Sequence, residues 1–292
     1  MAGKKQWEFT PPSYGFAVVK LHSWRYFFNF IQKEMLDFNT YIWRGQRCDD
    51  WLLESTLDRL IKKTAVAKKK RFFFRNAHLE QFKLAVRGRR GKTPPIIETE
   101  NDWWALGQHY GLATPLLDWT SSPFVAAYFA FIGAGEKQTK YRAVYALQRA
   151  NIESKVRHLL TWETLEQKRK IEEIESGKKK VVSGFARALL NAPIRKQVEF
   201  IRPKSDENQR LVNQGGLFTR APDELDMKSW VQNSFTEEEE NAYILIKILV
   251  PNSDREACLK GLNRMNINHL TLFPDLYGAS KFCNLYGEIE KY

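Results

Sequence analysis

The residues best suited to chemistry are gathered in one stretch, from Gln108 to Phe131. It places His109, Asp118 and three successive hydroxyl residues, Thr120–Ser122, directly before an apolar segment rich in alanine and phenylalanine. The last hydroxyl residue, followed by Pro123, predicts the start of a helix, since serine is a favoured N-cap and proline suits the first helical position. The free N–H groups at such a start favour an anion. We expect either a capped core helix after a tight turn or, together with the polar residues, an anion-binding site.

The histidine and the aspartate of this stretch allow two interpretations. His109 and Asp118 could serve as the acid and base of a hydrolase, because a histidine near a carboxylate can move a proton close to neutral pH. They could equally form a buried pair that locks the turn and has no chemical role.

Three more candidate positions lie outside that stretch. Tyr41–Gln46 predicts a short strand that ends in Arg44, Gly45 and Gln46. The planar guanidinium of Arg44 suits phosphate or carboxylate, although a surface ion pair would also account for it. Farther along, Glu199 lies in a short predicted strand, and Gln214 begins a loop that enters another strand.

Charge and composition limit the classes of protein that the chain can belong to. Its 292 residues carry a formal charge of +12. The excess is clustered, most clearly at Lys68–Arg71 and Arg87–Lys92. Such clusters are usually solvated surfaces, but they can also bind a polyanion such as nucleic acid. A hydrophobic content of 43% with 9 Trp and 19 Phe argues against disorder.

Other features indicate a protein of the reducing cytoplasm. The chain has no apolar run of about 18 residues, so no membrane-spanning helix is expected. Its first residues lack the apolar core of a secretory signal. Only three cysteines are present, far apart and without zinc-binding spacing, and buried thiols are the simplest interpretation for all three.

The predicted elements mix strands and helices without a regular strand–helix–strand rhythm, which favours an α+β fold. Residues 1–15 are expected to be a loose arm, and residues 16–292 a single domain with helical insertions at about 55–95 and 151–180. Strands are expected at 16–21, 41–46, 141–147, 198–201 and 242–250, with 214–219 a loop that enters a strand. Helices are expected at 23–37, 55–67, 70–88, 98–110, 122–131, 151–176, 254–265 and 276–290.

Several motifs together resemble the FRG domain, a bacterial and phage family named for a Phe-Arg-Gly motif. That motif stands here as Trp43-Arg44-Gly45, with tryptophan in place of phenylalanine. The longer signature is present as Gln108–Gly111, Thr114 and Leu116–Thr120. Further matches are Arg210, Gln214, Gly216, Phe218 and Leu272–Leu276, so the resemblance spans roughly residues 16–290. The family is little characterised, so the resemblance alone implies little about chemistry.

A second resemblance is to the arginine–serine–glutamate class of ADP-ribosyltransferases, in the order of the motifs. In that class a strand ending in Arg-Gly is followed by a Ser-Thr-Ser strand, an alanine- and phenylalanine-rich helix and a later Gln/Glu-x-Glu strand. Arg44-Gly45 resembles the first motif, and Thr120–Ser122 with its helix resembles the second. The third is open between Glu199, in Gln197-Val198-Glu199, and Gln214, which would leave the usual carboxylate missing; Glu240 is the least favoured. This resemblance implies a split antiparallel sheet surrounded by helices.

The same resemblance implies roles for the candidate residues toward NAD as substrate. Arg44, with Gly45 and Gln46, would hold the pyrophosphate. Ser121, flanked by Thr120 and Ser122, would bind the nicotinamide ribose or orient the carboxylate, and Glu199 or Gln214 would stabilise the transition state. His109 and Asp118 would contact the dinucleotide. No metal is expected.

Two hypotheses follow. The first is an NAD-dependent ADP-ribosyltransferase, acting as a toxin or phage-defence effector on nucleic acid or protein. The second is a non-catalytic module that binds nucleotide or nucleic acid, which is favoured if the third position is Gln214.

Overall fold

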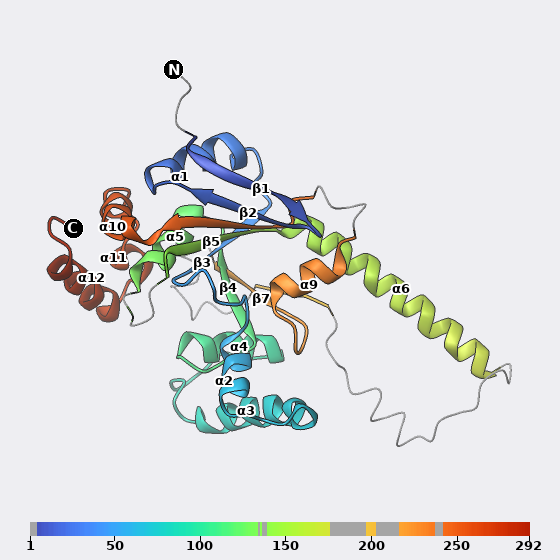
Figure 1. Ribbon diagram of the computed structural model, residues 1–292. Helices are drawn as coiled ribbons and strands as arrows, with labels where there is room; N and C mark the ends of the chain where they lie inside the picture. Colours follow the sequence, from blue (N-terminus) through green and yellow to red (C-terminus); the bar gives the residue numbers. More distant parts are fainter. Residues whose placement is uncertain (1–4, 134, 136–138, 176–196, 203–215, 237–241) are drawn as a thin grey trace.

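The computed structural model describes residues 5–133, 135, 139–175, 197–202, 216–236 and 242–292, and of 167–175 the backbone alone. Its strands are β1 Trp7–Ser13, β2 Phe16–Leu21, β3 Tyr41–Gln46, β4 Leu116–Thr120, β5 Tyr141–Gln148, β6 Glu199–Ile201, β7 Gly216–Arg220 and β8 Leu245–Pro251. They form one sheet in the order β1-β2-β8-β5-β3-β4-β7-β6. Only β2 and β8 are parallel neighbours. A mostly antiparallel sheet surrounded by helices confirms the predicted α+β class (Figure 1).

Most of the predicted helices are present with bounds shifted by a few residues. They are α1 Arg25–Phe30, continued by the π-helical turn η1 Ile31–Met35, α2 Thr56–Lys63, α3 Arg71–Ala85, α4 Glu100–His109, α5 Pro123–Ile132, α6 Arg149–Glu175, α9 Met227–Ser234, α10 Arg255–Arg264, α11 His269–Leu272 and α12 Leu276–Glu288, with 3-10 turns η2 Lys68–Lys70 and η4 Asn252–Asp254. Figure 1 shows α6 projecting away from the sheet, as expected of a polar helical insertion.

The N-terminal arm was predicted wrongly. Residues 7–13 form β1, an edge strand paired antiparallel with β2. Pro11 and Pro12 obscured it in the sequence, because proline cannot donate to a ladder. They are accommodated because β1 has a partner on one side only and because its register shifts between Thr10 and Ser13.

Three clusters of buried side chains hold the elements together. The first lies between one face of β2-β8-β5-β3 and helices α1, α5, α10 and α12. The second covers the opposite face, beneath α9 and the first turns of α6. The third joins β4, β6 and β7 to the lobe formed by α2, α3 and α4. This lobe contains the first predicted helical insertion.

Helix α5 is held at both ends by side-chain hydrogen bonds. The Ser122 hydroxyl accepts a hydrogen bond from the Val125 N–H at 3.3 Å, and Pro123 occupies the first helical position, as predicted. At the other end Arg142 Nη1 donates to the Ala130 and Gly133 carbonyls at 2.8 Å, and Arg255 Nε donates to the Phe131 carbonyl at 3.0 Å. Two guanidinium groups therefore satisfy carbonyls that a helix end leaves unpaired.

Two further features concern membrane-spanning helices and the burial of the cysteines. Across the described ranges, no helix combines the length and apolarity needed to cross a bilayer. Cys48 and Cys258 are buried as expected, but Cys283 is exposed on α12, so a buried position was the wrong expectation for that thiol.

Candidate functional site

The sheet has a seam between β3 and β4, where its backbone pairing nearly stops. These two strands share one register pair, Trp43 with Thr120. On either side of the seam the pairing is longer, with six residue pairs between β3 and β5 and five between β4 and β7. The candidate residues of the Arg-Gly and Thr-Ser-Ser motifs lie at this seam.

Arg44 bridges the seam with its side chain. Its Nη1 donates to the main-chain carbonyl of Asp118 at 2.8 Å and lies 3.5 Å from the Asp118 carboxylate oxygen Oδ2. The guanidinium therefore satisfies a carbonyl that no ladder bond from β3 reaches. The Arg44 side chain is 18% exposed, whereas that of Asp118 is 60% exposed, so the pair is open to solvent from the carboxylate side.

Gly45 faces the other way, against α5. A Cβ atom there would lie 1.9 Å from the Ala126 carbonyl oxygen and 2.5 Å from the Ala130 nitrogen. Only glycine leaves room for the helix backbone at this crossing. The Arg-Gly dipeptide thus fixes α5 on one face of β3 and presents a cation on the other.

The electrostatics of Arg44 combine two opposing effects. Burial lowers its pKa, and the neighbouring Asp118 carboxylate raises it again. Arginine stays charged at any ordinary pH despite such shifts. Its Nε is buried and has no partner among the described residues, and the same holds for Oε1 of Gln46, two positions along the strand. Both side chains therefore retain hydrogen-bonding capacity next to the seam.

A chain of hydrogen bonds extends from Arg44 into the α2–α4 lobe. Gln108 Nε2 donates to Asp118 Oδ1 at 2.7 Å, and the Thr114 hydroxyl donates to Gln108 Oε1. The Thr114 N–H donates to the Thr56 hydroxyl at 2.9 Å. Gln108 and Thr114 were noted in the sequence only as parts of the FRG signature. That signature was the signal that could have identified them as partners of Arg44 and Asp118.

The three hydroxyl residues after the seam differ in their availability. Thr120 is 4% exposed and accepts a hydrogen bond from the Ser122 N–H at 3.1 Å, and Ser122 caps α5. Ser121 is exposed between them, and no hydrogen bond to it occurs in the described part of the chain. Ser121 directly follows Thr120, the one residue of β4 that pairs with β3. The structure therefore brings Arg44 and Asp118 into contact and places Ser121 one residue after the end of β4.

His109 and Asp118 do not form the buried pair that was one of the two interpretations. Asp118 is exposed, and its partners are Gln108 and Arg44. His109 is half-buried at the end of α4 and packs edge-on against Tyr110, with ring centroids 4.7 Å apart. An acid–base role for the two stays a prediction.

Glu199 is not at the seam. It pairs with Arg220 on β7, and Arg220 pairs with Leu116 at the far end of β4 from Thr120. Four residues of strand, about 13 Å, separate that end from Thr120. The Glu199 carboxylate accepts a hydrogen bond from Asn101 Nδ2 at 3.2 Å. The seam end of β7 begins instead at Gly216, opposite Thr120; Gln214 and Glu240 lie outside the described residues.

Tyr145 is a neighbour that sequence reasoning missed. Tyr145 lies on β5, where it pairs with Arg44 of β3 on one side and with Lys247 of β8 on the other. Burial raises the pKa of the Tyr145 phenol, and the Asp49 and Asp226 carboxylates raise it further. The phenol therefore stays protonated. Its only signal in the sequence was a place in the alternating pattern of β5.

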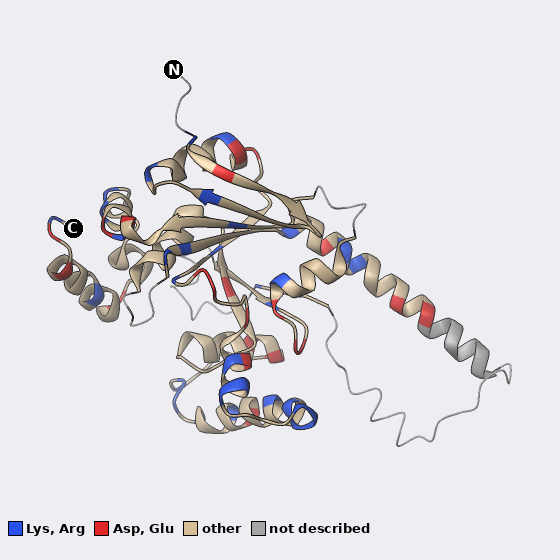
Figure 2. Ribbon diagram, in the orientation of Figure 1, with Lys and Arg blue, Asp and Glu red and all other residues tan. Residues whose placement is uncertain are grey.

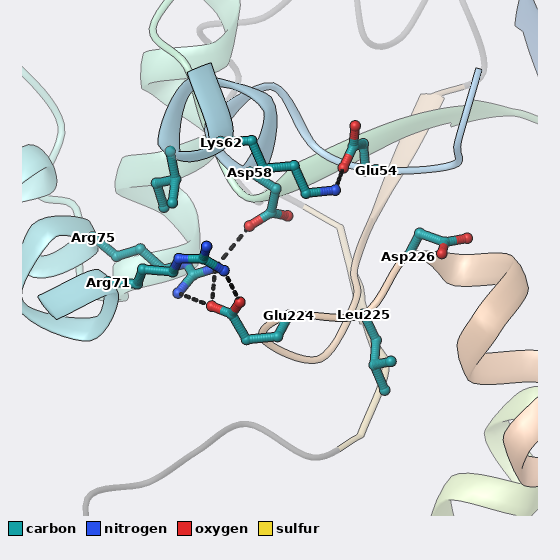
Figure 3. Close-up of a pocket in the computed structure, with 9 residues that line it drawn as sticks. Glu54, Asp58, Lys62, Arg71, Arg75, Glu224, Leu225 and Asp226 are labelled. Atoms are coloured by element: carbon teal, nitrogen blue, oxygen red, sulfur yellow. Dashed lines mark hydrogen bonds and ion pairs between the residues drawn. The ribbon is translucent and has the colours of Figure 1, made fainter. Parts of the chain in front are cut away.

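Two pockets lie away from the seam, and neither is lined by Arg44, Asp118 or Ser121. One is a groove of about 650 Å³ at the ends of β2, β5 and β8, lined by Lys20, His22 and Tyr141 among others. The other lies between α2, α3 and the loop before α9 (Figure 3). Its free volume of about 30 Å³ accepts water but no organic ligand. No group of three or more His, Cys, Asp or Glu suited to a metal occurs in the described ranges.

Comparison with known proteins gives one positive result. The family model of the FRG domain matches residues 39–139, which include β3, the α2–α4 lobe, β4 and α5. No curated protein and no solved structure matches the chain significantly. The match is shorter than the span suggested by the sequence motifs, and it contains every residue of the Arg44–Asp118–Gln108–Thr114 network. Residues 39–139 thus match the FRG domain, and four signature residues in this match, Arg44, Asp118, Gln108 and Thr114, form the side-chain network at the seam.

Proposed function

We propose that the chain binds NAD at the seam and transfers its ADP-ribose to an acceptor. The observation that carries the proposal is the charged contact at the seam: a mostly buried guanidinium already holds an exposed carboxylate. A site that holds one anion in this way can hold another, and a pyrophosphate suits the planar donors of arginine. On binding, the pyrophosphate replaces Asp118 as the partner of Arg44.

The surroundings of Arg44 supply further groups that such a ligand needs. The unpartnered Nε of Arg44 and Oε1 of Gln46 provide a donor and an acceptor. Ser121 provides an exposed hydroxyl before the N-terminus of a ten-residue helix, α5, whose dipole favours negative charge. We assign His109, the last residue of α4 and the neighbour of Gln108, a contact with the dinucleotide.

The proposed reaction breaks the bond between C1′ of the ribose and the nicotinamide nitrogen. Nicotinamide leaves with the electron pair, and positive charge develops on the sugar. The acceptor atom then attacks C1′ and loses its proton. A carboxylate near C1′ would stabilise that charge. Glu199, on β6, lies too far from the seam for this role. Gln214, which precedes the seam end of β7 in sequence, is therefore the better third-motif residue; it supplies hydrogen bonds but no charge.

Incubation with NAD labelled on the adenylate phosphate tests the proposal. The purified protein is mixed with total RNA, DNA and protein, and nicotinamide release is measured in parallel. We expect label in one acceptor class and its loss in Arg44→Lys and Ser121→Ala, whereas Arg157→Lys, on the exposed side of α6, keeps it. Wild-type protein that neither transfers label nor releases nicotinamide would refute the transferase. A toxin or phage-defence role predicts, in addition, that expression of wild type but not of Arg44→Lys slows growth.

The second candidate is a module that binds the nucleotide without turnover. It is favoured by the scarcity of carboxylates at the seam: Asp118, which contacts Arg44 there, is already engaged with Gln108. NAD binding without nicotinamide release would select this function. Nucleic acid as a partner, through Lys68–Arg71 and Arg87–Lys92, is compatible with either candidate, because both segments flank α3 on the lobe next to the seam.

A further inference from the structure

The positive charge of the chain is concentrated in one stretch. Residues 56–97 contain 13 Lys and Arg against 2 Asp and Glu, a net charge of +11, whereas the whole chain carries +12. The remaining 250 residues are therefore close to neutral. Figure 2 shows the basic residues of this stretch gathered on α2, α3 and the segment that follows them, below the sheet. Such an asymmetry indicates a surface for a polyanion.

Ion pairs neutralise only part of this charge. Lys62 pairs with Glu54, Arg71 with Glu224, and Lys83 with Glu80. Two groups of exposed cations form no ion pair with any residue that the structure describes. The first, which we call the lysine cluster, is Lys63, Lys68, Lys69 and Lys70; the second, the arginine cluster, is Arg87, Arg89 and Lys92.

The two clusters lie at opposite ends of α3. This helix has 15 residues and is therefore about 22 Å long. Its outward face carries Phe73, which is 67% exposed, the exposed amides Asn76 and Gln81, and Leu84, which is 47% exposed. Its one acid on that face, Glu80, is paired with Lys83 at 2.7 Å. A linear polyanion could therefore run from one cluster to the other along a face with little opposing charge.

The lobe is held firmly enough to serve as a platform. Arg75, 5% exposed, donates from Nη2 to Asp58 Oδ1 at 2.8 Å and pairs with Glu224 and Asp223 in the loop before α9. Figure 3 shows the Arg75 and Arg71 guanidiniums converging on Glu224. These contacts fix the inner side of α3 to the core and leave its outer side open.

The side chains on α3 favour single-stranded nucleic acid over other polyanions. Exposed aromatic rings stack with unpaired bases, and amides can bond to base edges, whereas a duplex hides its base faces. An anionic membrane would require a mainly apolar outward face, and Asn76, Glu80 and Gln81 interrupt it. We infer that α3, with the lysine and arginine clusters at its ends, binds single-stranded nucleic acid, with a base stacked on Phe73. This binding does not depend on chemistry at the seam.

Fluorescence anisotropy with a labelled single-stranded 12-mer of RNA or DNA tests the inference at 50 to 200 mM salt. Up to seven phosphate contacts predict a slope of log affinity against log salt of about −3 to −5. The triple variant Lys68→Gln, Lys69→Gln, Lys70→Gln should bind at least about tenfold more weakly, with a slope smaller by about 2. The control Lys33→Gln, Lys281→Gln, Lys291→Gln removes the same charge from exposed positions elsewhere and should change binding less than about twofold.

Phe73→Ala separates stacking from charge. Because Phe73 is exposed, the variant should keep the far-UV spectrum and unfolding temperature of wild type. We expect about tenfold weaker binding to the single strand and unchanged binding to heparin or to a duplex of equal length. Arg44→Lys should bind the strand as wild type does, whatever becomes of NAD. Absence of oligonucleotide binding, equal losses in the triple variant and its control, or binding only to phosphatidylserine vesicles would each overturn the inference.

Discussion

The seam divides the sheet into two halves, β1-β2-β8-β5-β3 and β4-β7-β6. Backbone ladders join the strands within a half, whereas side chains join one half to the other. From β2 through β8 and β5 to β3, backbone ladders of five to seven residue pairs run without interruption, over a continuous apolar core. Between β3 and β4 one pair remains, and Arg44, Asp118, Gln108 and Thr114 replace the ladder with side-chain hydrogen bonds. The backbone hydrogen bonds of a ladder are shielded from water and hold the strands rigidly. The side-chain bridge at the seam is partly exposed to solvent, so its groups can exchange hydrogen-bond partners. We therefore propose that a ligand binds at the seam, and we expect the ladders to provide most of the stability.

The largest effect should come from the packed side of β3. Gly45→Ala places a methyl group 1.9 Å from the Ala126 carbonyl, so α5 must move, and we expect a loss of about 3 kcal/mol or more in the free energy of unfolding. Urea unfolding measures it. Gly88→Ala is the matched control: its φ is +71° but the added methyl group meets open space, so it should cost about 1 kcal/mol. Equal losses would show that α5 does not depend on close approach.

The second-largest effect should be a loss of folding stability at acidic pH, through the contact between α5 and α11. Tyr128 and His269 Nδ1 are hydrogen-bonded at 2.7 Å between α5 and α11, and burial lowers the pKa of His269 to about 4. Since the unfolded histidine titrates near 6.5, the unfolded state binds more protons between these values. Stability is therefore full above pH 6.5 and falls as the pH drops toward 4, by about 2 to 3 kcal/mol. His269→Gln should remove that part of the pH dependence of unfolding; an unchanged profile would contradict this assignment.

Loss of the bridging cation should cost less. Arg44→Met leaves the Asp118 carbonyl without its donor and the carboxylate without its counter-charge, and we expect a loss of about 2 kcal/mol in urea unfolding. Arg157→Met, on an exposed part of α6, should change stability by less than about 0.5 kcal/mol. A loss at Arg44 no larger than that of the control would mean that the seam does not need its side-chain bridge.

The smallest expected effect is the coupling free energy between the side chains that bridge β3 and β4. Gln108→Ala and Asp118→Ala should each cost about 1 kcal/mol, and the double variant less than the sum, with a coupling of about 0.5 to 1 kcal/mol. The pair Lys260→Ala and Glu256→Ala, an exposed contact on α10, should show a coupling of only a few tenths. Additive losses at Gln108 and Asp118 would argue against a connected network.

The ladder half could be predicted from the sequence far better than the seam. The strands β2, β5 and β8 and the Ser-Pro start of α5 are local signals, and their predicted bounds agree with the structure to within three residues. β1 was missed because its prolines break the strand pattern, and β4 because its short sequence carries a polar residue in the middle. Local patterns also placed Arg44 and Asp118 in candidate roles.

What local patterns did not supply was the pairing between distant residues. The register of β6, β7 and β4 moves Glu199 away from Arg44, and nothing within Gln197–Pro203 encodes that register. Likewise, Gln108 gains its role only because α4 ends beside β4. Such facts depend on tertiary contacts, which hydrophobic periodicity does not record.

We propose that Arg44 holds the pyrophosphate of NAD at the seam and that Asp118 occupies its place beforehand. Titration calorimetry with NAD tests it most directly on wild type, Arg44→Lys and Asp118→Asn. We expect wild type to bind, Arg44→Lys to bind at least about tenfold more weakly, because an ammonium lacks the fork of donors, and Asp118→Asn to bind more tightly, because a competing charge is gone. Wild-type protein that gives no binding heat, or three affinities that are the same, would contradict the account.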